Sequence, residues 1–113
     1  DGRVRAVWNY NIAFLYCFSG KLTKAIRHYR KATSVIVHPD IIFQIEDFMC
    51  WAARMYPEKR QLYFCLGFFN WKAKGDMIQA KSDFLEFINN VDGRNFQNEK
   101  NLAAKWIEEM GCH

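Results

Sequence analysis

The sequence predicts an all-α fold, and three observations lead to this prediction. Apolar residues recur at spacings of three and four along most of the 113-residue chain, as they do on one face of a helix. No segment shows the sustained two-residue alternation that is typical of a half-buried strand. Half of the residues are hydrophobic, so a domain of this length can bury a core without a metal ion or a disulfide.

The first two helices are expected over residues 4–18 and 22–36, because Ser19 and Gly20 interrupt the helical pattern between them. The second helix has the clearest amphipathic spacing in the chain. Its apolar positions share one face and should be buried. They are Leu22, Ala25, Ile26, Tyr29, Ala32 and Ile36.

A third helix is expected over residues 41–56, with the carboxylate of Asp40 as its N-cap and Pro57 as its end. Its predicted buried stripe consists of Ile41, Ile45, Phe48, Met49, Ala52 and Tyr56. The fourth helix, residues 59–74, is apolar around most of its circumference. That pattern is typical of a helix that is buried on several sides.

Gly75 and Asp76 should turn the chain, with Asp76 as the N-cap of a fifth helix that ends near Asn89. Its predicted buried residues are Met77, Ala80, Phe84 and Ile88. A sixth helix, residues 98–110, has one apolar side and one charged side, as the last helix of an array requires. We therefore expect one domain, residues 1–113, of about six antiparallel helices joined by short loops.

Two segments carry a similar pattern. Residues 9–32 read N-x2-I-A-x2-Y, then Gly20, then A-x3-Y-x2-A, and residues 63–84 read Y-x2-L-G, then Trp71, then Gly75-Asp76, then A-x3-F. Both resemble the helix–turn–helix unit of tetratricopeptide (TPR) repeats, whose pattern is W-x2-L-G-x2-Y followed by A-x3-F. The resemblance covers about half of the chain and implies a TPR-like α–α superhelix of antiparallel helical hairpins.

The second segment departs from the family pattern by one residue. An extra position lies between Gly67 and Gly75, so that Trp71 stands where the pattern would place Asn70. The two turn glycines are 55 residues apart, whereas the units of a regular TPR array recur at intervals of about 34 residues. The glycine spacing exceeds the length of one repeat by about one helix and a turn. We expect the array to accommodate this insertion by pairing helix one with two, three with four and five with six; the alternative is that the right-handed stacking of the repeats is interrupted.

Charge, hydropathy and cysteine content indicate the environment in which the protein is expected to occur. Residues 1–39 carry a net charge of +6 and residues 40–113 a net charge of −2. No apolar run approaches the roughly 20 residues that cross a bilayer, so a soluble protein without a membrane role is expected. The four cysteines are scattered and form no C-x2-C motif. We interpret Cys17, Cys50, Cys65 and Cys112 as free thiols in the cytoplasm, with a disulfide or a metal site as the alternative.

The resemblance implies a function in protein–protein interaction, because TPR units line an inner groove with the first helix of each unit. Carried over by position, the groove candidates are Tyr10, Phe14, Phe18, Phe64, Phe68 and Trp71. The same aromatic stripes could instead be core, or a surface for self-association. Some TPR domains grip a C-terminal carboxylate with Lys and Asn, but the matching positions here are aromatic. Trp51 lies on a mostly polar side of its helix, which suits an interface anchor.

A second candidate surface is basic. Lys24, Arg27 and Lys31 share one face of the second helix, away from its apolar stripe. The simplest interpretation is a solvated outer face. An acidic protein is the next, and nucleic acid the least favoured, because no exposed aromatic side chain accompanies the cations.

No catalytic motif is present in the sequence: it contains no H-E-x-x-H, glycine-rich phosphate loop or nucleophile elbow. We therefore expect a non-catalytic interaction or scaffold domain with no cofactor, no metal and no catalytic residue. Because the chain begins at Asp1, we also expect it to be excised from a larger protein. The alternative from another class is a regulatory or substrate-positioning appendage of an enzyme whose catalytic domain is absent.

Overall fold

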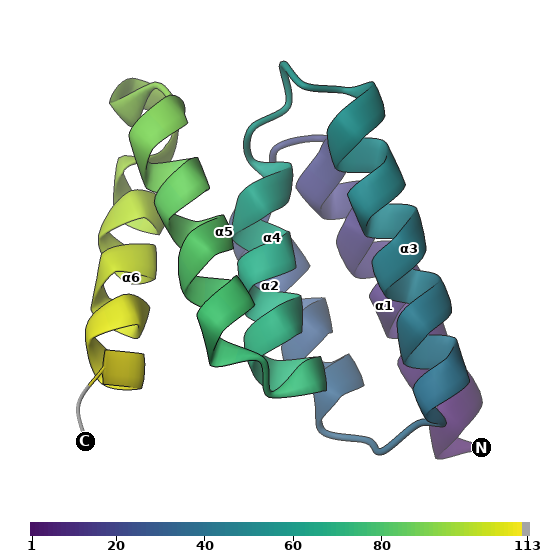
Figure 1. Ribbon diagram of the computed structural model, residues 1–113. Coiled ribbons are helices and arrows are strands. Elements are labelled where there is room, and N and C mark those ends of the chain that lie inside the picture. Colours follow the sequence, from purple (N-terminus) through teal and green to yellow (C-terminus); the bar gives the residue numbers. More distant parts are fainter. Residues whose placement is uncertain (112–113) are drawn as a thin grey trace.

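The computed structural model describes residues 1–111, which are mostly helical and contain no strand (Figure 1). Cys112, one of the predicted free thiols, lies outside the described residues. The elements are α1 (Gly2–Phe18), α2 (Leu22–Thr33), α3 (Pro39–Met55), α4 (Leu62–Phe69), the π-helix η1 (Asn70–Lys74), α5 (Met77–Asn90) and α6 (Gly93–Gly111). The predicted all-α fold of about six helices is confirmed.

Successive helices run in opposite directions, and α4 lies at the centre of the molecule (Figure 1). It contacts α1, α2, α3 and α5. All of its residues except Tyr63 are buried, as the apolar circumference of this segment predicts. The helices α5 and α6 extend the array on the side away from α1 (Figure 1).

The closest helix pairs are α1 with α2 and α4 with α5, which are the two segments that carry the repeat pattern. The expected pairing of α3 with α4 as the second hairpin is therefore wrong. The reason is the small residue Gly67, since a Cβ added there would lie 2.6 Å from the Phe84 ring. Such a close approach is open only to a helix pair with no side chain between the backbones. The small buried residues Ala13 and Ala25 lie at the corresponding positions of α1 and α2.

The starts of α1, α3 and α5 are each capped by a side chain that accepts from free backbone amides. The Asp1 carboxylate accepts from the N–H groups of Arg3 (2.8 Å) and Val4, so α1 begins earlier than predicted. The predicted cap Asp40 is wrong, because Asp40 N–H itself donates to His38 Nδ1 (3.1 Å) and Pro39 occupies the first turn. The predicted cap of α5 is confirmed, since Asp76 accepts from the N–H group of Gln79 (3.1 Å).

The helix α2 ends at Thr33, three residues before the predicted end, and Ile36 is exposed rather than part of the buried stripe. The hydroxyl of Thr33 donates to the Tyr29 carbonyl (2.9 Å), and that of Ser34 donates to the Lys31 carbonyl (2.7 Å). These local bonds compete with continued helical pairing. Leu22, Ala25, Ile26, Tyr29 and Ala32 are buried as predicted.

The extra residue of the second repeat segment is accommodated by η1. Both Gly75 N–H and Asp76 N–H (2.8 Å) donate to the carbonyl of Asn70, five and six residues earlier. One widened turn thus absorbs the added position without breaking the helix. Gly75 then adopts a left-handed conformation, φ +67°, in which glycine carries no steric cost.

Cys17 of α1 and Cys65 of α4 form a disulfide, with their Cα atoms 6.6 Å apart. The prediction of free thiols is therefore wrong for these two residues, whose separation in sequence gave no indication of their contact. Cys50 is free and half-buried. Because these two cysteines are not free thiols, they do not support the expected reducing, cytoplasmic compartment. Within residues 1–111, no helix is both long enough and apolar enough to cross a bilayer.

Candidate functional site

Three of the six groove candidates are core residues. Tyr10, Phe64 and Phe68 are 2, 0 and 0% exposed, respectively. Burial raises the pKa of Tyr10 to about 12, because the charged phenolate would lose its hydration. Since α4 is covered on several sides, its aromatic residues cannot line an open groove together with α1.

Trp71 belongs to an aromatic cluster around Trp106 of α6. It is half-buried, its ring centroid lies 5.6 Å from that of Trp106, and Lys72 Nζ lies 3.9 Å from the Trp71 ring. Phe68 and Phe84 pack on the same Trp106 side chain. Trp71 therefore connects η1 to α6 rather than lying beside the α1 candidates.

The remaining two candidates, Phe14 and Phe18, meet aromatic residues of α3. Phe14 makes an edge-to-face contact with Phe48 at 4.9 Å, and Phe18 makes one with Tyr56 at 5.0 Å. Both α1 side chains are half-buried. Because these large side chains lie between α1 and α3, the two backbones do not pack closely along their length.

Two adjoining depressions, of about 220 and 230 Å³, follow the line where α1 and α3 meet. We call this surface the α1–α3 groove. Phe14 and Phe48 line both depressions, so the two adjoin where these rings meet. One is lined in addition by Leu15, Phe18, Trp51, Ala52 and Tyr56, and the other by Val7, Tyr10, Asn11, Ile41, Gln44, Ile45 and Met49.

Three large aromatic side chains in the groove remain accessible, namely Phe48, Trp51 and Tyr56. Phe48 and Trp51 are 50 and 46% exposed, and their rings stack with centroids 5.8 Å apart. Leu15 of α1 is exposed at the groove edge. Accessible aromatic residues that gather beside a concave surface are typical of a binding site for another protein.

The predicted buried stripe of α3 is wrong for Phe48 and Tyr56, because the core side of α3 is narrower and consists of Met49, Ala52 and Ala53. The helical spacing alone thus places Phe48 in the core, whereas the structure shows it at the surface. A signal was present, since Gln44, Phe48, Trp51 and Met55 are spaced by four, three and four residues and form a second stripe. The predicted interface anchor Trp51 lies in this stripe.

The basic face is formed as expected by Lys24, Arg27 and Lys31, which are all exposed on α2. None of the ion pairs among residues 1–111 involves them. Burial, together with the neighbouring charges of Lys31 and Arg27, lowers the pKa of His28. This face therefore has an uncompensated positive charge, and among residues 1–111 the one cation–π contact of these three cations is that of Lys24 Nζ with the Tyr16 ring, 5.6 Å from its centroid.

Metal-ligating residues do not converge in the part of the chain that the structure describes, where no three His, Cys, Asp or Glu side chains could hold an ion together. Comparisons of the chain with protein-family models, with curated proteins and with solved structures return no match. The groove and the surfaces around it are therefore the features of this protein that indicate a function.

Proposed function

We propose that this is a TPR-like, non-catalytic interaction domain that binds a segment of another protein in the α1–α3 groove. The observation that carries the proposal is the pair Phe48 and Trp51, which lie half-exposed beside Phe14 in the α1–α3 groove. Water contact of two stacked aromatic rings is unfavourable, and a partner that covers them would recover the free energy of burying that apolar surface.

The repeat-like packing supports the TPR-like part of the proposal. Both pattern-bearing segments form close antiparallel hairpins, α1 with α2 and α4 with α5. Small residues lie at the contact in each hairpin, namely Ala13 and Ala25 in one and Gly67 in the other. Such a frame holds the groove residues on regular helices, which favours a preformed binding surface.

The lining of the groove defines the chemistry of its occupant. No charged side chain of the described residues lines either depression, and Asn11 and Gln44 are the main polar ones. A charged anchor would be buried without a partner, which is unfavourable. We therefore expect a helical or extended segment that inserts one large apolar side chain into each depression, at neighbouring positions on its own surface.

The first prediction tests this groove with the double variant Phe48→Ala/Trp51→Ala. Peptides are selected from a displayed random library on the wild-type domain, and their affinities are measured by fluorescence anisotropy. Because central aromatic anchors contribute about 2 kcal/mol or more, the double variant should bind at least roughly 30-fold more weakly. The control is Ile78→Ala on α5, which removes a more exposed apolar side chain outside the groove.

The proposal fails if the selected peptides bind the double variant as tightly as the wild type. A second copy of the chain in the groove would instead produce a dimer in sedimentation experiments, and the double variant would then be monomeric. The basic face offers a further comparison, since Lys24→Glu/Arg27→Glu/Lys31→Glu should leave binding to an apolar groove unchanged. Loss of binding in that variant alone would favour an acidic partner on α2.

We infer the compartment from the cysteines. The Cys17–Cys65 disulfide favours an oxidising compartment over the cytoplasm, because disulfides are rarely stable in the reducing cytosol. A partner for the groove is then to be sought among proteins that share this compartment.

A further inference from the structure

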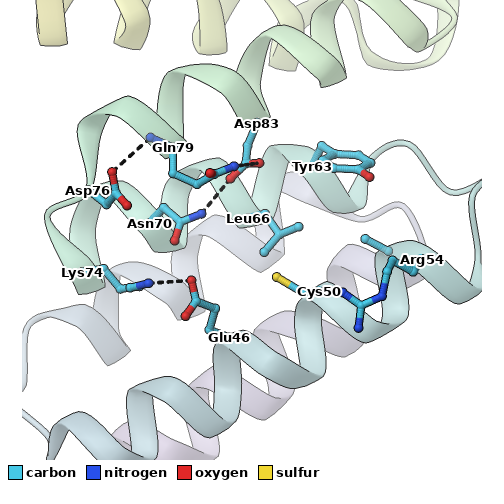
Figure 2. A pocket seen from close by; sticks show the side chains of 11 residues that line it. Glu46, Cys50, Arg54, Tyr63, Leu66, Asn70, Lys74, Asp76, Gln79 and Asp83 are labelled. Carbon is cyan, nitrogen blue, oxygen red and sulfur yellow. Dashed lines mark hydrogen bonds and ion pairs between the residues drawn. The ribbon is translucent and has the colours of Figure 1, made fainter.

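A second cavity lies on the other side of α3 and shares no lining residue with the α1–α3 groove among the described residues. Its volume is about 430 Å³, and it is open to solvent between α3 on one side and α4, η1 and α5 on the other (Figure 2). We call it the η1 pocket. Its charged and amide side chains include Glu46, Arg54, Asn70, Lys74, Asp76 and Asp83. A cavity of this size accommodates a small organic molecule.

Asn70 is the central polar group of the η1 pocket. It is 2% exposed, and its Nδ2 donates to Asp83 Oδ2 at 2.7 Å. In Figure 2 its side chain lies between Asp83 and the Lys74–Glu46 pair. The carbonyl Oδ1 has no hydrogen-bond donor among residues 1–111. A buried acceptor without a donor is unfavourable, so a ligand that donates to Asn70 Oδ1 would be stabilised there.

The π-helix η1 places Asn70 in this position. Asn70 is its first residue, and the widened turn accommodates the one extra residue of the second repeat segment. Turns of this kind are rare and occur frequently at functional sites. The departure from the repeat pattern and the unpaired amide oxygen thus coincide at the same residue.

Asp83 is the second group without a complementary partner. It is 5% exposed and accepts from two neutral amides, Asn70 Nδ2 and Gln79 Nε2 (3.0 Å). No cation forms an ion pair with it among the described residues: Lys74 pairs with Glu46 at 2.6 Å, and Arg54, the other cation of the pocket lining, forms no ion pair. Burial raises the pKa of Asp83 to about 6, so the carboxylate is mostly charged at pH 7. A buried carboxylate of this kind favours a bound cation.

We propose that the η1 pocket binds a small organic cation whose ammonium group donates to Asn70 Oδ1 and to the Asp83 carboxylate. An ammonium group suits these acceptors because it has three donors and can reach both at once. Leu66 and Tyr63 provide an apolar wall for an alkyl chain, and Asp76 adds a further negative charge. The described residues bring no three metal-ligating side chains together, so the organic cation is preferred to a metal ion.

The experiment titrates the full chain with 1,4-diaminobutane and follows backbone and side-chain amides by two-dimensional ¹H–¹⁵N NMR at pH 7. The neutral probe 1,4-butanediol has the same length and lacks the charge. We expect saturable shifts of the Asn70 side-chain amide and of the backbone amides of residues 70–76 with the diamine, and no comparable shifts with the diol. The shifts should be the same in the groove variant Phe48→Ala/Trp51→Ala, because the two surfaces are separate.

Asp83→Asn keeps the size of the side chain and removes its charge, so it should weaken diamine binding at least tenfold. The matched control is Glu86→Gln, which removes a carboxylate of α5 that pairs with Arg60 outside the pocket. Should Asp83→Asn fail to fold, Asp76→Asn serves instead, since Asp76 is exposed, and a several-fold loss is expected. Shifts that are equal for the diol, that lie outside the pocket, or that persist unchanged in the pocket variants would overturn the proposal.

Discussion

The closest approach of α4 to α5 occurs at a single residue, Gly67. A Cβ at this position would lie 2.6 Å from two atoms of the Phe84 ring, which is itself fully buried. Phe84 also packs on Phe64 and Trp106, so its ring cannot move away without disturbing the aromatic cluster. At the residue scale, the absence of one methyl group sets the position of a helix.

Gly67→Ala should therefore lower the free energy of unfolding. Overpacking of this kind costs about 1–3 kcal/mol. The helix propensity gained from alanine offsets about 1 kcal/mol of that cost. Urea denaturation followed by circular dichroism measures the difference, and Gly2→Ala is the control, since the described chain places no atom within 4 Å of a Cβ there. If Gly67→Ala proves as stable as the wild type, the close helix contact is not a feature of the protein.

Asp83 makes folding depend on pH. Its pKa is raised from 3.8 to about 6, chiefly by burial and secondarily by the neighbouring carboxylates of Asp76 and Glu46, although the amides of Gln79 and Asn70 oppose the shift. Between these values the folded chain binds more protons at this site than the unfolded chain. The contribution of Asp83 to stability is therefore present at low pH and decreases as the pH rises through about 6.

The corresponding measurement compares urea denaturation of the wild type and Asp83→Asn at pH 4, 5.5 and 7. Other carboxyl groups titrate in both proteins, so the difference between the two isolates Asp83. We expect the variant to gain stability relative to the wild type as the pH rises, with most of the change complete by pH 7. A difference that stays constant with pH would show that Asp83 titrates normally in the folded protein.

At the scale of elements, the sequence predicts each helix because every one has a strong apolar spacing or a clear stop. Ser19-Gly20, Pro57 and Gly75-Asp76 lie between helices as predicted. The apolar circumference of α4 correctly indicates its central position. These features are local, since a few neighbouring residues determine them.

The candidate site is harder to predict from the sequence than the helices are, because it depends on which helices become neighbours. Phe14 and Phe18 were identified from the repeat resemblance, but their partners Phe48 and Tyr56 were assigned to the core. The stripe of α3 is apolar on two adjacent sides, and periodicity alone cannot tell which one faces α4. The sequence pattern marks Asn70 only as a departure from the repeat. That its Oδ1 lacks a donor among the described residues depends on the three-dimensional arrangement, in which its Nδ2 donates to Asp83.

At the scale of the whole molecule, α3 connects the two surfaces. Its Phe48 and Trp51 face α1 in the groove, whereas Glu46 and Arg54 line the η1 pocket on the other side. Contacts between side chains fix α3 against the rest of the fold. They include the edge-to-face contact of Phe48 with Phe14 and the ion pair of Glu46 with Lys74. The frame on which both surfaces depend is therefore the packing of α1, α2, α4 and α5.

The Cys17–Cys65 disulfide ties this frame together, since it joins α1 to α4 across 48 residues of sequence. Because the crosslink restricts the unfolded chain, removing it should lower the free energy of unfolding by about 2–4 kcal/mol. Cys17→Ala/Cys65→Ala, compared with the wild type by urea denaturation without reductant, measures this loss. Cys50→Ala is the control, because that thiol is free and half-buried.

A second measurement separates the crosslink from the packing of the two sulfur atoms. The wild type denatured in the presence of a reductant should lose about the same stability as the double variant loses, whereas the double variant should not respond to the reductant. If the reductant leaves the wild type unchanged, the two cysteines are free thiols in the folded protein. The preference for an oxidising compartment would then fall, and the cytoplasmic location expected from the sequence would be favoured again.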